Sequence, residues 1–139
     1  MELTSDQKVA FKKLAHRHRL KLIIAFGSQV TKNIHAESDL DIAVRSGKNE
    51  ISLKEFTDIT YALEKIFNGK KIDLCFINRA DPLLLKKIAE SAFLLYGVSN
   101  DFAEFKCFSF RRFEDYRPYF KLEERFVRNY IKELQLARR

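Results

Sequence analysis

The residues best suited to chemistry lie between positions 26 and 44, in FGSQVTKNIHAESDLDIAV, where a Gly-Ser pair precedes two aspartates. Asp39 and Asp41 are one residue apart in SDLDIAV (38–44), whose apolar residues alternate as in a strand with one buried face. Residues two apart on a strand point the same way, so the two carboxylates should project side by side. Adjacent carboxylates repel each other, and a divalent cation between them removes that cost. The spacing therefore predicts a Mg²⁺ site.

A third acid interrupts a later apolar run. Asp73 lies in KIDLCFI (71–77), which also alternates as a strand does. If this strand pairs beside 38–44, three carboxylates converge on one site. Three acids are enough to hold two metal ions, or one ion with a general base for an attacking hydroxyl.

The Gly27-Ser28 pair directly follows LKLIIAF (20–26), a short run that is typical of a buried strand. Glycine permits a tight turn and a close backbone approach to a ligand. A helix opening at Ser28 would direct free N–H groups at an anion, and the hydroxyl adds one more donor. The pair therefore predicts a phosphate cradle next to the metal site.

Each of these residues also has a structural interpretation. Ser28 alone is typical of a helix N-cap, Asp39 of a turn, and Asp73 of an exposed edge strand. Those interpretations do not explain why the three strand carboxylates share a face beside a Gly-Ser pair. The combination favours a catalytic site.

The elements that must position these residues form an α+β fold, a small mixed sheet flanked by helices. In chain order we expect a helix from Thr4, strands at 20–26 and 38–44, a helix from a capping box at Ser52 and Glu55 to Asn68-Gly69, a strand at 71–77, and a helix from Asp81-Pro82 toward Gly97.

The composition becomes charged and aromatic after Asn100. The spacing predicts two helical segments with a break or kink near Arg117-Pro118. We therefore divide the chain into a catalytic domain (1–98) and a C-terminal helical extension (99–139). The extension packs on the domain, on a partner, or on both.

The composition also limits the classes of function. The chain has 139 residues and a formal charge of +7, which favours anionic partners without choosing among them. Two cysteines without metal-ligand spacing argue against a zinc site or a disulfide framework. No signal-peptide core, membrane span or nucleic-acid-binding signature is present, so we expect a cytoplasmic protein with no membrane association and no direct nucleic-acid binding.

The order Gly27-Ser28, ten residues, Asp39, one residue, Asp41, with Asp73 on a later strand, resembles the signature of the DNA polymerase β-like nucleotidyltransferase superfamily. The small size resembles its minimal nucleotidyltransferase branch. The tail from LLYG (94–97) onward resembles the C-terminal helices of MntA-type antitoxins, which are encoded with HEPN-domain ribonuclease toxins.

The resemblance implies an activity and a set of roles. Members of that family transfer AMP from ATP onto a tyrosine of the toxin and so silence it. Asp39, Asp41 and Asp73 would be the catalytic acids that bind Mg²⁺, two ions in all. Asp73 would alternatively accept the proton of the incoming hydroxyl. Gly27 and Ser28 would contact the nucleotide phosphates.

One motif departs from the family. The family commonly has Arg-x-Arg-Gly after Gly-Ser, whereas this chain has Gln29-Val30-Thr31-Lys32. Lys32 is expected to supply a positive charge for the nucleotide. The alternative function is an antitoxin that is weak in catalysis and acts by binding its toxin directly. An antibiotic-modifying nucleotidyltransferase is disfavoured because the chain lacks room for a further substrate domain.

Overall fold

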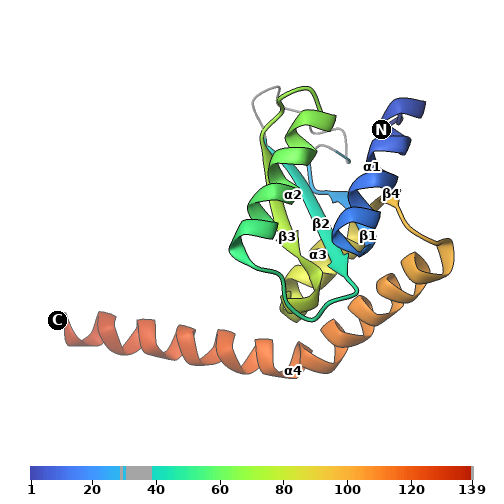
Figure 1. The fold of residues 1–139 in the computed structure, drawn as a ribbon. Helices are drawn as coiled ribbons and strands as arrows, with labels where there is room; N and C mark the ends of the chain where they lie inside the picture. Colours follow the sequence, from blue (N-terminus) through green and yellow to red (C-terminus); the bar gives the residue numbers. More distant parts are fainter. Residues whose placement is uncertain (29, 31–38, 139) are drawn as a thin grey trace.

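The computed structural model describes residues 1–28, 30 and 39–138 (Figure 1). The elements follow one another as α1 (Ser5–His18), β1 (Leu20–Phe26), β2 (Leu40–Ser46), α2 (Leu53–Ile66), β3 (Ile72–Phe76), the short 3-10 helix η1 (Ile77–Arg79), α3 (Pro82–Glu90), β4 (Phe93–Tyr96) and α4 (Ser99–Ala137). The expected strands at 20–26, 38–44 and 71–77 correspond to β1, β2 and β3.

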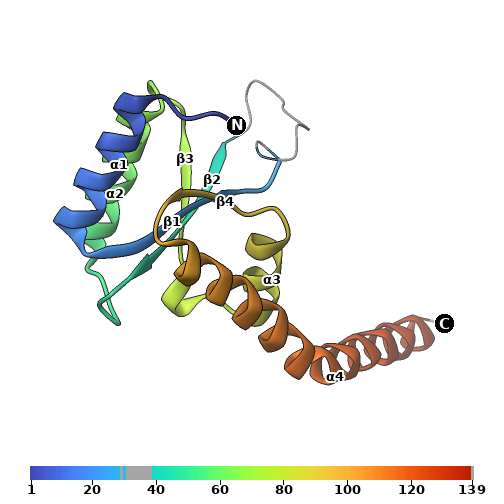
Figure 2. The same cartoon turned by 90° about the vertical axis from the view of Figure 1, so that its right-hand side faces the viewer.

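One mixed sheet, in the order β3-β2-β1-β4, forms the centre of the protein. β1 pairs antiparallel with both β2 and β4, whereas β2 and β3 run parallel. Figure 2 shows α1 and α2 on one side of the sheet, and α3 with the first part of α4 on the other. The predicted α+β fold is confirmed.

Two apolar clusters hold these layers together, one on each face of the sheet. Leu40, Ile42 and Val44 of β2 pack toward α1 and α2. Ala43 packs on the opposite face with Phe105 of α4 and the buried residues of α3. Full burial of one such large side chain contributes about 1.5–3 kcal/mol. The predicted alternation of β2 is confirmed, and it directs Asp41 toward the side covered by α3 and α4.

The strand β4 was not expected from the sequence. We predicted a helix running from Asp81-Pro82 toward Gly97, but α3 ends at Glu90 and residues 93–96 pair with β1. A four-residue apolar run fits a helix as well as a strand, and only the pairing with β1 decides between them.

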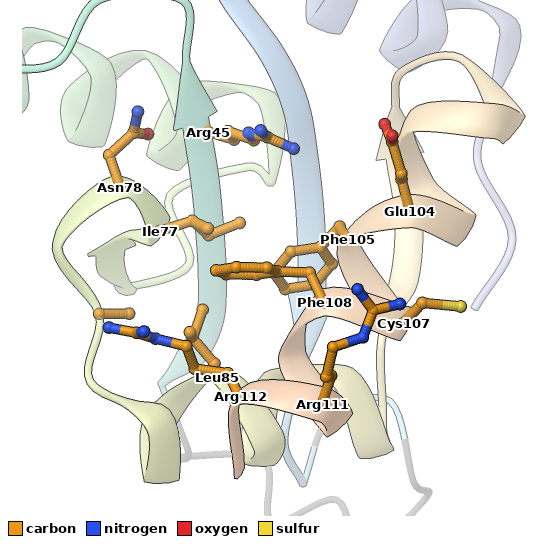
Figure 3. Close-up of a pocket in the computed structure, with 11 residues that line it drawn as sticks. Arg45, Ile77, Asn78, Leu85, Glu104, Phe105, Cys107, Phe108, Arg111 and Arg112 are labelled. Atoms are coloured by element: carbon orange, nitrogen blue, oxygen red, sulfur yellow. The ribbon is translucent and has the colours of Figure 1, made fainter. Parts of the chain in front are cut away.

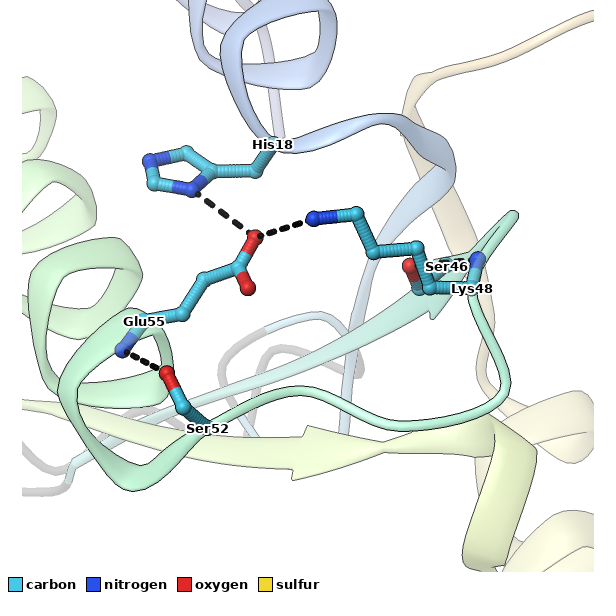
Figure 4. Close-up of polar contacts among 5 residues, drawn as sticks. All are labelled: His18, Ser46, Lys48, Ser52 and Glu55. Atoms are coloured by element: carbon cyan, nitrogen blue, oxygen red, sulfur yellow. Dashed lines mark hydrogen bonds and ion pairs between the residues drawn. The ribbon is translucent and has the colours of Figure 1, made fainter.

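The helix starts agree with the sequence in part. The capping box at Thr4 is formed, and the Ser52 hydroxyl accepts a hydrogen bond from the N–H of Glu55. The Glu55 side chain does not complete a second box. Its Oε1 instead lies 3.3 Å from Nδ1 of His18 and 3.7 Å from Nζ of Lys48 (Figure 4). Glu55 therefore ties the end of α1 to the segment that joins β2 and α2.

The C-terminal extension is one helix and not two. Pro118 lies inside α4, and the helix changes direction along its length without a break (Figure 1). Its first half packs against α3, while every residue from 121 to 137 is exposed. We call residues 121–137 the arm. Among the described residues, no helix combines the length and apolar character that a membrane span requires.

Candidate functional site

Asp41 and Asp73 form the centre of the site. They are register partners on the parallel strands β2 and β3. Partial burial, together with the facing Asp73 carboxylate, raises the pKa of Asp41 above its ordinary value, and Lys87 acts in the opposite direction. The expected pairing of the two acidic strands is confirmed, and it brings two of the three predicted acids together.

The third acid, Asp39, lies one residue before β2 and is exposed. Its Oδ2 is 4.0 Å from Nζ of Lys71, although its charge still contributes to the raised pKa of Asp41. Within the described residues, no three His, Cys, Asp or Glu side chains are grouped so that they could hold a metal ion. Asp39 is therefore at the edge of the site, turned toward Lys71.

The Gly27-Ser28 turn lies directly against this pair. Gly27 has a φ of +80°, and a Cβ built there would overlap Oδ2 of Asp41. The N–H of Gly27 donates to Oγ of Ser91, 2.9 Å away, which ties the turn to the end of α3. Half-buried Ser28 is in the same turn. Lys32, the expected basic residue, lies outside the described residues.

Three residues near the site were not assigned a catalytic or binding role from the sequence. The charge of Lys87 on α3 opposes the rise in the pKa of Asp41. Oγ of Ser91 accepts a hydrogen bond from the N–H of Gly27. Cys75 follows Asp73 on the same face of β3, and burial and the two aspartates raise the pKa of its thiol. An exposed lysine within a helix has no distinguishing local pattern, so only the packing of α3 against the sheet reveals Lys87.

The donor set fits a divalent cation such as Mg²⁺. Asp41 and Asp73 offer carboxylate oxygens, the ligands that Mg²⁺ prefers, with Asp39 at the same edge. Partial burial first, and then the nearby Asp73 and Asp39, raise the pKa of Asp41, and a cation at this position would favour the ionised carboxylate. Gly27 also leaves room for the Asp41 carboxylate, because a Cβ at this position would overlap its Oδ2.

Comparison with known proteins agrees with this geometry. Residues 10–101, which include the Gly-Ser turn and all three aspartates, match the family described as "Polymerase beta, Nucleotidyltransferase". The chain belongs to this nucleotidyltransferase family. The match begins within α1 and ends in the first turn of α4, so the family region contains the whole sheet.

The chain is similar to one curated protein and to several solved structures. The protein adenylyltransferase MntA of Aphanizomenon flos-aquae (strain 2012/KM1/D3) is 32% identical over 90 residues, which are 59% of this chain and 60% of that protein. This chain thus aligns with less than two thirds of the relative's length.

Two solved toxin-antitoxin structures share the fold. A chain of a toxin-antitoxin crystal structure with AMP-PNP has a TM-score of 0.68 at 20% identity, covering 90% of this chain and 98% of that one. A chain of a complex between the tri-AMPylated Shewanella oneidensis HEPN toxin and an MNT antitoxin has a TM-score of 0.65 at 17% identity, covering 94% and 99%.

Proposed function

We propose that this chain is an antitoxin that transfers AMP from ATP to a hydroxyl group, a tyrosine by preference, on a HEPN-domain toxin in the cytoplasm. The observation that carries the proposal is the Asp41–Asp73 pair beside the Gly27 turn in a nucleotidyltransferase sheet. The similarity to a protein adenylyltransferase and to antitoxins solved with their toxins supports the choice of reaction and partner.

The transfer would proceed by in-line attack. The hydroxyl oxygen of the toxin forms a bond to the α-phosphorus of ATP, the bond from that phosphorus to the bridging oxygen breaks, and pyrophosphate leaves. Asp73, the more exposed acid of the pair, would accept the hydroxyl proton. Ser28 would contact the phosphates through its backbone N–H group and its hydroxyl. Gly27, whose N–H donates to Ser91, would allow the backbone to approach them closely.

Asp39, Asp41 and Asp73 would hold Mg²⁺, which when bound neutralises phosphate charge. Asp39 pairs with Lys71 at an exposed surface, where an ion pair is worth little, so the carboxylate is available to the ion. Lys32 and Lys87 would add positive charge for the triphosphate. Lys87 already acts electrostatically on Asp41 from α3.

The toxin would bind along the arm. Leu122, Phe126, Tyr130 and Leu134 recur every four residues on one side of the helix, and each is about half exposed or more. Most of the stability of a helix in a protein comes from packing of its apolar face, so a partner that buries this side would stabilise the arm. We propose that residues 1–98 perform catalysis and that residues 99–139 hold the toxin.

Intact-mass spectrometry of the HEPN-domain protein encoded with this chain, after incubation with ATP and Mg²⁺, tests the proposal. We expect mass gains in steps of one AMP. They should vanish with Asp39→Ala/Asp41→Ala and persist with Asp58→Ala, an exposed acid on α2 across the sheet.

The same experiment tests the second candidate, an antitoxin that acts by binding alone. The exposed apolar side of the arm favours that candidate because it provides a docking surface that does not depend on the aspartates. An unmodified toxin that still co-purifies with both the native chain and the double variant would establish binding alone and refute the transfer.

A further inference from the structure

A separate cavity lies at the other end of the face that carries the aspartates. It has a volume of about 570 Å³ and is enclosed by the end of β2, η1, the start of α3 and the first half of α4 (Figure 3). Arg45 lines it and follows Asp41 by four residues on the same face of β2. At the rise of an extended strand this places the two Cα atoms ~13 Å apart. The cavity is thus distinct from the carboxylate site.

The base of the cavity is apolar and buried. Phe105 is 1% exposed, and Leu85 and Ile77 are also buried in the cluster on this face of the sheet. Phe108, in contrast, is 52% exposed, and its ring lies beside that of Phe105 in the middle of the cavity (Figure 3). A flat apolar group could stack on Phe108 without disturbing the core.

Three arginines, Arg45, Arg111 and Arg112, surround these rings. Within the part of the chain that the structure describes, none of the three forms an ion pair with a carboxylate. The guanidinium of Arg112 lies over the ring of Tyr116, 5.1 Å from its centroid, which leaves its N–H groups available. One acid, Glu104, also lines the cavity, so the lining carries an excess of positive charge.

The amide side chain of the cavity lining, Asn78, is already hydrogen-bonded. The Asn78 side chain accepts a hydrogen bond from the N–H of Ser46 and donates to the carbonyl groups of Ser46 and Lys48. It therefore fixes the end of β2 and does not compete for a ligand. The arginines are the cationic groups of the lining that can bind an anion.

Guanidinium groups and an apolar base select a particular chemistry. The planar fork of arginine binds phosphate oxygens with two parallel hydrogen bonds. Ligand cavities typically measure about 300–1,000 Å³ and combine apolar walls with a few polar groups, as here.

We propose that this cavity is a second anion site, which binds a phosphate-bearing ligand of mononucleotide size. Its phosphate would bind Arg45 and Arg112, Arg111 would add positive charge, and any base would stack on Phe108. The proposal does not depend on the transfer of AMP at the carboxylate site.

Isothermal titration of the full chain with AMP and with inorganic phosphate, both in EDTA, tests the site without Mg²⁺. We expect both ligands to bind, and Arg45→Met and Arg112→Met each to weaken binding by roughly ten-fold or more. The matched control is Arg125→Met, an exposed arginine of the arm, which should bind as the native chain does. AMP binding tighter than phosphate would assign the base to Phe108, and equal affinities would assign the site to phosphate alone.

Three results would overturn the proposal. The first is no binding of either ligand to the folded native chain. The second is binding that is lost in Asp41→Asn but retained in both pocket variants, which would assign the signal to the carboxylate site. Arg112 is exposed on α4, so Arg112→Met keeps the test valid even if Arg45→Met fails to fold. Pocket variants that weaken only the toxin complex, with no effect on AMP or phosphate, would likewise reject the anion site.

Discussion

Asp41 of β2 and Asp73 of β3 occupy the same register position on two parallel strands, so their carboxylates face each other at one edge of the sheet. The arrangement is unfavourable without a cation, because partial burial and mutual repulsion both raise the pKa of Asp41. The pair therefore destabilises the folded protein, and a cation bound between the carboxylates would remove this destabilisation.

Removing one charge of this pair should stabilise the protein when no metal is present. We expect Asp41→Asn to raise the melting temperature in EDTA by roughly 1–4 °C and to lower AMP transfer about 100-fold or more. Mg²⁺ should stabilise the native chain and have little effect on the variant. Differential scanning fluorimetry with and without Mg²⁺ measures this, with Asp58→Asn as the control. A lower melting temperature for Asp41→Asn in EDTA would contradict it.

The same pair predicts a pH dependence of stability in EDTA. The folded-state pKa of Asp41 lies above its unfolded value, so the ionised carboxyl destabilises the folded protein at neutral pH. This penalty falls as the pH drops through the raised pKa and is gone below the ordinary value of 3.8. The difference in melting temperature between Asp41→Asn and the native chain should therefore shrink from pH 7 toward pH 4. A difference that is constant over this range would refute the electrostatic origin.

Substitutions at two glycines test whether the close approach of Gly27 to Asp41 matters for activity. Gly27 and Gly69 both have positive φ, at +80° and +86°, but only at Gly27 would a Cβ overlap another residue. Gly69→Ala should cost about 1 kcal/mol of backbone strain and leave AMP transfer intact. Gly27→Ala should cost more and lower transfer by about ten-fold or more, because the Asp41 carboxylate must move. Urea unfolding and the mass assay measure both effects, and equal activities in the two variants would contradict the role assigned to Gly27.

The contacts of Glu55 predict a change in stability without a change in function. Its carboxylate lies near His18 and Lys48 on the side of the protein away from the aspartates. Glu55→Gln should lower the free energy of unfolding by about 1 kcal/mol and leave AMP transfer unchanged. Glu64→Gln, on the same helix, is the control and should have a smaller effect. Urea unfolding monitored by circular dichroism measures the change in stability. A change in the rate of AMP transfer would show that Glu55 also affects the catalytic site.

The apolar side of the arm predicts a variant that weakens toxin binding without changing the stability of the chain. Phe126 is 71% exposed, so Phe126→Ser should leave the melting temperature of the isolated chain unchanged. It should weaken the complex with the HEPN toxin by roughly ten-fold or more, since large aromatic side chains dominate interface energies. Arg125 is the adjacent residue and lies on a different side of the helix, so Arg125→Ser serves as the control. Equal affinities of the two variants in a binding titration would show that the arm does not hold the toxin.

Local patterns in the sequence determined much of this site. The alternation of apolar residues in 40–44 and 72–76 is enough to place Asp41 and Asp73 on the faces that they occupy, because a strand has a fixed period of two. The Gly-Ser pair and its distance from Asp39 and Asp41 identify the family from the sequence, because these residues lie in one continuous segment of the chain. Thr4 and Ser52 likewise mark helix starts through hydrogen bonds within a single turn.

Tertiary structure alone decided the remainder. Short runs such as 93–96 become strands only when a neighbouring strand satisfies their backbone groups, so β4 could not be read from the sequence. Lys87, Ser91 and Arg45 acquire their neighbours through the packing of α3 and α4 on the sheet, which brings together residues far apart in the chain. Spacing along one strand therefore reveals the acids, whereas the partners of those acids depend on contacts between distant segments, which no local pattern records.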